Sequence, residues 1–154
     1  MIEISNFISD EDSRELIEFH NKNFGVDKKY CFTHRDTEVL DLSSGFPVGF
    51  KKITDTLNKF IKTIDENYEI NYFQIVRWPT GESQDEHKDF DYHPYTTILY
   101  LNDDYKGGET VVGDQTILPE RNKLIGFEGD KTTHKVNEIT QGTRYTLPCW
   151  YKNA

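Results

Sequence analysis

The chain has 154 residues and a formal net charge of −9, from 18 Lys and Arg against 27 Asp and Glu. This length predicts one compact domain over residues 1–154 and excludes a separate large cofactor domain. The negative charge repels polyanions, so nucleic acid and anionic membranes are not expected partners. The hydrophobic share of 35% is low, but 10 Phe, 9 Tyr and 2 Trp supply large side chains for a core.

The N-terminal segment, MIEISNFISDED, has neither a basic leader nor an apolar run. No stretch approaches the ~18 apolar residues of a transmembrane helix. We therefore expect a soluble, cytoplasmic protein. Cys31 and Cys149 do not form the dense framework of a small secreted domain, so both are predicted to be free thiols, with a disulfide as the less favoured alternative.

Two helices are predicted in the N-terminal part of the chain. Ser9 begins a sequence with the form of a capping box, and apolar residues recur behind it at helical spacing, which predicts a helix from about Asp10 to Asn23. A second helix is predicted from Pro47 onward, where one apolar stripe lies opposite a lysine-rich face. Its stripe consists of Phe50, Ile53, Leu57, Phe60, Ile61 and Ile64. Both stripes are interpreted as surfaces that cover a sheet, in preference to partner-binding surfaces.

The segment between these helices, residues 28–45, is less regular and is predicted to supply an edge strand with a mobile loop. After Asn67 the sequence changes to short aromatic and β-branched runs broken by Gly, Pro and Asp. The predicted strands are residues 70–78, 95–101, 109–112, 115–118, 123–127, 135–139 and 143–151. Residues 1–68 would thus give helical support and residues 69–152 a β core. This order predicts a mostly β fold, an antiparallel sandwich or barrel buttressed on one face by helices.

Five histidines are the candidates for metal binding or acid–base chemistry. His20 lies near the apolar stripe of the first helix and His34 lies in the irregular segment, so both are interpreted as structural or solvated. His87 and Asp89 follow a turn in an extended segment, where residues two apart point to the same face. The His-x-Asp pattern alone is weak, because an exposed polar strand edge also explains it.

His134 strengthens the pattern, because it begins another extended segment and can bring a second imidazole to the same point. Two imidazoles and one carboxylate are the ligand set of facial-triad iron sites, which leave three octahedral positions open. Arg144 follows in the next strand. A guanidinium buried in a barrel needs an anion, and its planar fork suits a carboxylate. Alone, Arg144 would be interpreted as a surface residue paired with an acid; together with the triad, it predicts a site for a dicarboxylate.

Six ordered blocks of the sequence now resemble a known family. They are Arg77-Trp78-Pro79-Thr80-Gly81, His87-Lys88-Asp89, Thr97-Ile98-Leu99-Tyr100-Leu101-Asn102, Gly107-Gly108-Glu109-Thr110, His134-Lys135-Val136 and Gly142-Thr143-Arg144-Tyr145 with Trp150-Tyr151. In this order and spacing they resemble the iron(II)/2-oxoglutarate dioxygenases of the prolyl 4-hydroxylase type. The resemblance covers about residues 71–151.

The resemblance implies a double-stranded β-helix of the jelly-roll or cupin type. It further implies that His87, Asp89 and His134 bind Fe(II), and that Arg144 holds the distal carboxylate of the cosubstrate 2-oxoglutarate, with dioxygen as the oxidant. Tyr100 matches a family tyrosine whose hydroxyl assists Arg144, and its alternative is a core aromatic in a strand.

The resemblance also implies a substrate rim, for which His93, Trp78, Arg77, Trp150 and residues 28–45 are the candidates. Relatives commonly have an arginine at the position of His93, so the substrate class stays open. The implied reaction hydroxylates a prolyl residue in a peptide or protein and releases succinate and carbon dioxide. The alternatives are a related oxygenase acting on another amino acid, a nucleobase or a small molecule, and a non-catalytic jelly-roll binding module.

Overall fold

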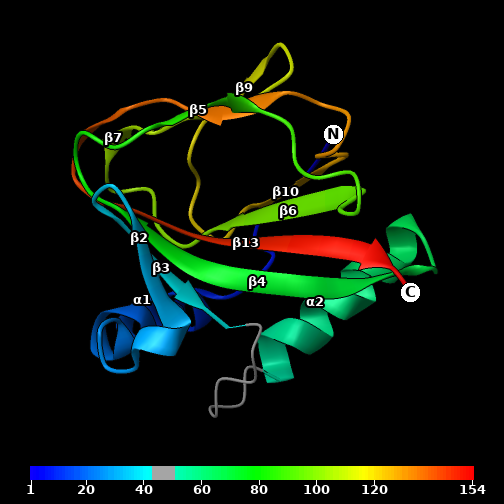
Figure 1. Ribbon diagram of the computed structural model, residues 1–154, viewed down its shortest axis with the longest axis horizontal. Helices are drawn as coiled ribbons and strands as arrows, with labels where there is room; N and C mark the ends of the chain where they lie inside the picture. The colour runs from blue at the N-terminus through cyan, green and yellow to red at the C-terminus, as the bar shows by residue number, and fades with distance from the viewer. Residues whose placement is uncertain (43–50) are drawn as a thin grey trace.

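The computed structural model describes residues 1–42 and 51–154. Within this part, the helices are α1 (Asp10–Asn23), the 3-10 helix η1 (Lys28–Tyr30) and α2 (Lys51–Ile64). Figure 1 shows two layers of strands, with α1 and α2 on the outer face of the larger sheet. This arrangement confirms the predicted class, a mostly β fold of the double-stranded β-helix type with helices packed on one face.

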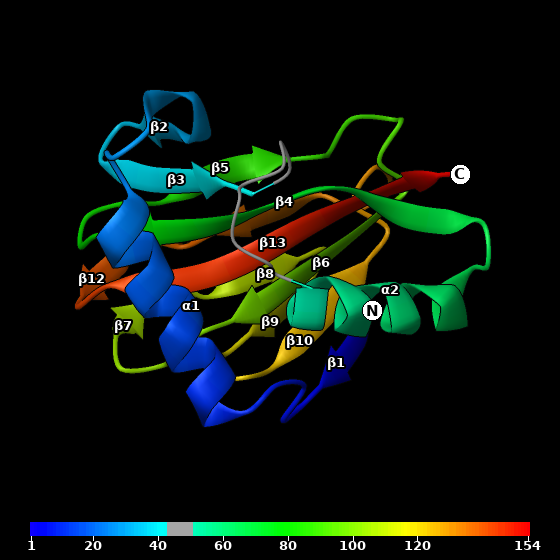
Figure 2. The same cartoon turned by 90° about the horizontal axis from the view of Figure 1, so that it is seen from below.

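The larger sheet has seven strands in the order β1-β10-β6-β13-β4-β3-β2. Their bounds are β1 Ile2–Ile4, β10 Leu124–Phe127, β6 Tyr95–Tyr100, β13 Arg144–Asn153, β4 Tyr68–Trp78, β3 Thr37–Asp41 and β2 Cys31–His34. Every neighbouring pair is antiparallel. The long strands β4 and β13 pair along most of their length and form the centre of this sheet (Figure 2).

The smaller sheet has four strands in the order β5-β11-β8-β9. Their bounds are β5 Gln84–His87, β11 His134–Val136, β8 Thr110–Val112 and β9 Gln115–Ile117; a separate pair is formed by β7 Lys106–Gly107 and β12 Ile139–Gln141. In Figure 1 the smaller sheet lies above the larger one, opposite the helices. The space between the two sheets is therefore separated from the helices by the larger sheet.

The helix α1 forms where the capping-box sequence predicts it. The Ser9 hydroxyl accepts a hydrogen bond from the Asp12 backbone N–H, and the Asp12 carboxylate accepts one from the Ser9 backbone N–H. Leu16 and His20 are buried beneath the helix. In α2 the predicted stripe buries Ile53, Leu57 and Ile61, so both stripes cover the sheet (Figure 2).

The alternation along β13 divides the molecule into two interiors. Tyr145, Leu147, Cys149 and Tyr151 belong to the large core cluster, together with the buried faces of the helices. The alternate residues of β13 face the other way, because successive side chains of a strand point to opposite faces. These residues, among them Arg144 and Trp150, line a cavity on the side of the smaller sheet.

Several predictions need correction in the N-terminal part of the chain. Residues 1–68 are not only helical, because β1, β2 and β3 lie within them, and residues 31–41 form a two-stranded hairpin where one edge strand was predicted. The predicted beginning of the second helix, including Pro47 and Phe50, lies outside the described residues. The predicted strand 135–139 is divided into β11 and β12, and β5 was not predicted. These short, polar strands exist because they pair with distant strands, and their own sequence carries no alternation that would reveal them.

Cys31 and Cys149 are free thiols, as predicted. Burial raises the pKa of the Cys149 thiol to about 12, which keeps it protonated and unreactive. Among the described residues, no helix is both long enough and apolar enough to cross a membrane.

His20 is expected to make stability depend on pH. Burial lowers the pKa of this fully buried histidine below its ordinary value of 6.5, although its Nε2 donates to the Glu38 carbonyl at 3.1 Å. The fold therefore keeps the neutral form, and its contribution is complete above pH 6.5 and is lost as the pH falls below that value. We expect the melting temperature of the wild type to fall more steeply below pH 6.5 than that of His20→Gln, which offers a donor but does not titrate. Parallel melting-temperature curves for the two proteins would contradict this.

Candidate active site

Three candidate metal ligands meet between β5 and β11. His87 ends β5 and His134 begins β11, and the two residues are direct partners in the antiparallel register. Asp89 follows β5, and its backbone N–H donates to the Gly129 carbonyl at 2.9 Å. The Asp89 Oδ1 atom lies 3.2 Å from His134 Nε2 and 3.8 Å from His87 Nε2. One donor atom from each residue fits within a span of 4.8 Å, so the structure brings the predicted triad together.

Hydrogen bonds on the far side of each ring prepare the triad for a metal. The Nδ1 atom of His87 lies 2.8 Å from the Asp85 carbonyl, and that of His134 lies 2.9 Å from the Thr132 carbonyl. A carbonyl only accepts, so each Nδ1 carries a proton, and Nε2 is the ring atom of each histidine that can bind a metal once it is deprotonated. The donor set therefore fits a ferrous ion.

The Asp89 carboxylate is held in a fixed orientation by Thr96. The Thr96 hydroxyl donates to Asp89 Oδ2 at 2.6 Å, which leaves Oδ1 facing the two imidazoles. Burial acts to raise the pKa of Asp89, but the hydrogen bonds from His134 and Thr96 and the nearby imidazoles outweigh it, so the pKa lies below its ordinary value. Burial acts to lower the pKa of His134, but the hydrogen bonds to Asp89 and Thr132 outweigh it, so this pKa lies above its ordinary value. Asp89 is thus an anionic ligand.

Gly129 supplies the space in which the Asp89 carboxylate lies. A Cβ atom at this position would overlap Asp89 Oδ2 and the Thr96 hydroxyl. We therefore expect Gly129→Ala to displace the carboxylate and to weaken metal binding by roughly 10–100-fold, the scale of a lost outer-shell partner. Titration of the apoprotein with Mn(II) measures this, and Thr96→Ser, which keeps the hydroxyl, is the matched control. Unchanged metal affinity in Gly129→Ala would show that the pocket tolerates the added methyl group.

Arg144 is a buried cation beside the same cavity. Arg144 is only 1% exposed. Its guanidinium donates to the Thr110 hydroxyl at 3.1 Å and lies 4.9 Å from the centre of the Trp78 ring. Within residues 1–42 and 51–154, no carboxylate forms an ion pair with it, and its Nε has no hydrogen-bond partner. A buried charge without a counterion is costly, so this environment fits the carboxylate of a bound ligand.

Tyr100 is linked to Arg144 through the hydroxyl of Thr110. Its fully buried hydroxyl forms a hydrogen bond with the Thr110 hydroxyl, which also accepts from Arg144. The ring of Tyr100 also packs in a core cluster with Val112 and Phe127. Both interpretations of this tyrosine, as an aid to Arg144 and as a core aromatic, therefore describe real contacts.

The cavity that joins these groups has a volume of about 320 Å³. Its lining includes the triad and Arg144 together with apolar side chains from both sheets, among them Val76, Ile98 and Val136. Of the predicted rim residues, Trp78 and Trp150 line this cavity. The structure thus places the candidate metal ligands and the buried cation in the lining of one cavity.

Two predicted rim residues do not line the cavity. Arg77 lies between two cavity-lining neighbours of β4, so its side chain points to the helix side of the sheet, where it lies 3.7 Å from Glu38. His93 is 1% exposed, and its Nε2 lies 2.7 Å from the Asn71 amide nitrogen. The strand alternation explains the position of Arg77. His93 packs behind the aromatic lining, against the ring of Tyr72.

The hairpin of β2 and β3 lies within residues 28–45, the segment predicted to belong to the substrate rim, and it contributes residues to the cavity lining. His34, interpreted as structural or solvated, lines the cavity together with Phe32. The hairpin turn is fastened by Glu82, whose buried carboxylate lies 3.3 Å from Arg35 Nε and accepts from the Asp36 backbone N–H at 3.0 Å. No local pattern could show that this hairpin lines the cavity, because the hairpin is held by Glu82, which lies 46 positions from Asp36 in the sequence.

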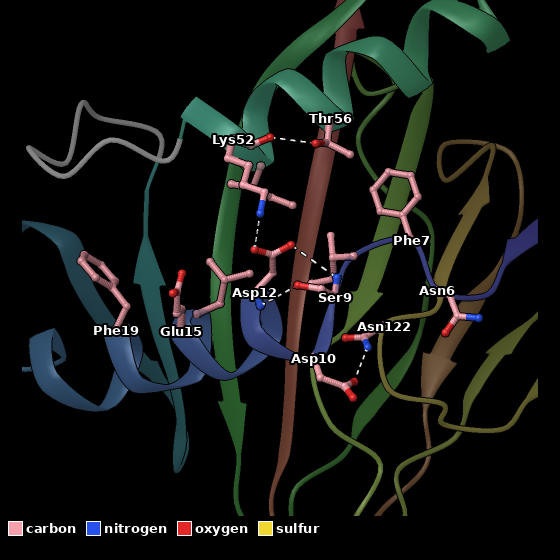
Figure 3. A pocket seen from close by; sticks show the side chains of 13 residues that line it. Asn6, Phe7, Ser9, Asp10, Asp12, Glu15, Phe19, Lys52, Thr56 and Asn122 are labelled. Carbon is pink, nitrogen blue, oxygen red and sulfur yellow. Dashed lines mark hydrogen bonds and ion pairs between the residues drawn. The ribbon is translucent and has the colours of Figure 1, made fainter.

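A second cavity, of about 690 Å³, lies between α1 and α2 (Figure 3). It is bounded by the ion pair between Lys52 and Asp12, at 2.8 Å, and by the hydrogen bond from Asn122 to Asp10. None of the triad residues lines it. Although this cavity is larger, its lining lacks the candidate metal ligands that are found between the sheets.

Comparison with known proteins agrees with this geometry. Prolyl 3-hydroxylase 3 from Mus musculus is 34% identical over 80 residues, covering 47% of this chain and 11% of the relative. The chain thus spans about a tenth of the length of that curated relative.

Solved structures share the fold across almost the whole chain. The viral collagen prolyl hydroxylase of Paramecium Bursaria Chlorella virus-1 has a TM-score of 0.81 at 20% identity, with 99% of this chain and 95% of that chain covered. The prolyl hydroxylase from Trichoplax adhaerens, solved with a hypoxia inducible factor peptide fragment, has a TM-score of 0.77 at 17% identity, with coverage of 99% and 83%. The family model of the 2OG-Fe(II) oxygenase superfamily matches residues 73–152. The chain therefore belongs to the 2OG-Fe(II) oxygenase superfamily, whose cofactors are ferrous iron, 2-oxoglutarate and dioxygen.

Proposed function

We propose that this protein is a dioxygenase that hydroxylates a prolyl residue in a peptide or protein. The observation that carries the proposal is the presence, in one cavity, of the His87, Asp89 and His134 cluster and the buried cation Arg144, which has no acidic partner among the described residues. A metal alone does not explain Arg144, and an anion-binding site alone does not explain the triad. A cosubstrate that contacts a metal at one end and a guanidinium at the other explains both.

In this proposal His87, Asp89 and His134 hold ferrous iron, and Arg144 holds the distal carboxylate of 2-oxoglutarate. When bound, the iron and the cosubstrate supply an oxidation in which one oxygen atom enters a C–H bond and 2-oxoglutarate becomes succinate and carbon dioxide. The protein orients these groups. Thr96 fixes the Asp89 carboxylate, and the apolar lining excludes water from the oxidant.

The similar proteins support a prolyl substrate, because they include prolyl hydroxylases, one of them solved in complex with a peptide. The net charge of −9 supports a peptide over a nucleic acid, because a phosphate-binding groove needs a basic stripe. A cytoplasmic location belongs to the same proposal.

The test is to incubate the purified protein with Fe(II), 2-oxoglutarate and a library of proline-containing peptides, and to measure succinate together with the mass gain of one oxygen atom. Hydrolysis and separation of 3- and 4-hydroxyproline then determine the position of the hydroxyl group. We expect peptide-dependent succinate and hydroxyproline. Hydroxylation of a residue other than proline, or succinate formation that no peptide stimulates, would contradict a prolyl hydroxylase.

A further inference from the structure

The cavity between α1 and α2 has an apolar surface that is already in place. It has a volume of about 690 Å³, which is within the range of ligand pockets. Among its lining residues, Ile8, Leu16 and Ile53 are buried members of the large core cluster, and Phe7 and Phe19 are half-buried against that cluster. We call this space the helix cavity. Because the packing of the core orders its apolar surface, the entropic cost of binding a ligand there is low.

The charged lining of the helix cavity is mainly acidic. Asp10, Asp12 and Glu15 of α1 line it, whereas Lys52 of α2 is the cationic residue among the described residues of the lining. The Lys52 ammonium group is already bound to Asp12, at 2.8 Å. Figure 3 shows this ion pair joining α2 to the beginning of α1. The carboxylates of Asp10 and Glu15 therefore give the cavity an excess of negative charge.

Asn122 adds a buried hydrogen-bond acceptor to the same lining. Asn122 is 5% exposed, and its side-chain nitrogen donates to Asp10 Oδ1 at 2.7 Å. Its Oδ1 atom is buried and has no hydrogen-bond partner within residues 1–42 and 51–154. Figure 3 shows this amide beside the Asp10 carboxylate in the wall of the cavity. A buried acceptor without a donor is costly, so this part of the cavity favours a ligand that donates hydrogen bonds.

Glu15 offers a further acceptor on the α1 side of the cavity. It is exposed and lies three residues after Asp12, so the two carboxylates are on the same face of α1. Lys52 forms its ion pair with Asp12 and not with Glu15. The Glu15 carboxylate is therefore available to a cationic ligand.

We propose that the helix cavity binds a small amphiphilic amine, whose ammonium group contacts the carboxylates of α1 and whose aromatic or aliphatic body packs against the apolar lining. The apolar lining accounts for the body of such a ligand, and the available acceptors account for its positive charge and its N–H donors. An anionic ligand is disfavoured, because Asp10 and Glu15 would repel it. This site is separate from the proposed function, since none of the triad residues lines it.

The test uses probes that share an indole ring and differ in charge: tryptamine is a cation, tryptophol is neutral and indole-3-propionate is an anion. Each probe is titrated into the folded protein, loaded with Zn(II) and 2-oxoglutarate so that the probes do not compete for the cavity between the sheets. Amide NMR spectra locate the binding. We expect tryptamine to shift the amide signals of Phe7, Leu16 and Ile53. Its affinity should exceed that of tryptophol roughly tenfold, the scale of two partly exposed ion pairs, and indole-3-propionate should bind more weakly than tryptophol.

Asp10→Asn and Glu15→Gln each remove one negative charge and keep the shape of the side chain. Each should weaken tryptamine binding roughly threefold, the scale of one exposed ion pair, and leave tryptophol binding unchanged. Glu18→Gln is the matched control, because Glu18 is exposed on α1 but does not line the cavity. Thermal melting checks that each variant is folded.

Equal affinities for tryptamine and tryptophol, or spectral shifts confined to residues outside the helix cavity, would overturn the amine site. Unchanged tryptamine affinity in both Asp10→Asn and Glu15→Gln would do the same. If Glu18→Gln weakened tryptamine as much as the two cavity variants, the overall negative charge of the chain would explain the binding, and the proposal would be wrong.

Discussion

His134→Ala is expected to abolish the conversion of 2-oxoglutarate to succinate and to leave the protein folded. The substitution removes one of three donor atoms that lie within 4.8 Å. The loss of metal affinity should exceed the roughly 10–100-fold cost of losing an outer-shell partner. The free energy of unfolding of the apoprotein should change by only about 1 kcal/mol, because Asp89 keeps its hydrogen bond from Thr96. Metal titration, succinate formation and thermal melting measure the three effects.

His34→Ala provides the matched control for this substitution. His34 also lines the cavity, but it does not belong to the cluster of donor atoms. Its removal should leave metal affinity unchanged. If His134→Ala kept full activity, or if both histidine variants lost metal equally, the ligand assignment would be wrong.

Arg144→Met is expected to separate ligand binding from stability. Removing one partner of a buried, hydrogen-bonded charge pair costs about 2–5 kcal/mol, so the Kd for 2-oxoglutarate should rise roughly 30-fold or more. The affinity for Mn(II) should stay near that of the wild type, because Arg144 contacts no member of the triad. The apoprotein should be as stable as the wild type or more stable, since an apolar side chain of similar size replaces a buried charge that has no acidic partner in the described part of the chain.

Calorimetric titration with 2-oxoglutarate and melting of the apoprotein give the two readouts for Arg144→Met. Thr146→Val serves as the control, because Thr146 lies two residues after Arg144 on the same face of β13, lines the same cavity and carries no charge. Unchanged affinity for 2-oxoglutarate in Arg144→Met would place the anion site elsewhere. A large loss of stability in the apoprotein would mean that Arg144 has a structural partner.

The long elements of the fold were predictable because each carries its own local signal. The capping box at Ser9 and the stripe behind it define α1 with the bounds that were predicted. The alternation in β4, β6 and β13 likewise gives strands close to the predicted ranges. The polar strand β5 was not among the predicted strands, although the segment at His87 was interpreted as extended, because β5 is ordered by its pairing with β11 and not by its own residues.

The amino-acid sequence by itself determined which side chains this protein offers for chemistry. Two histidines, an aspartate and an arginine stand in an order and spacing that matched a family, and no folded structure was needed to select them. Residue type and order can be read from the sequence directly, because they do not depend on how the chain folds.

Only the tertiary structure decided which neighbours these side chains have. It turned Arg77 to the helix side, buried His93 behind Tyr72 and brought His34 to the cavity through the hairpin that Glu82 fastens. The physical reason is that strand phase and long-range contacts set the direction of a side chain, and a shift of one residue moves it to the opposite face of a sheet.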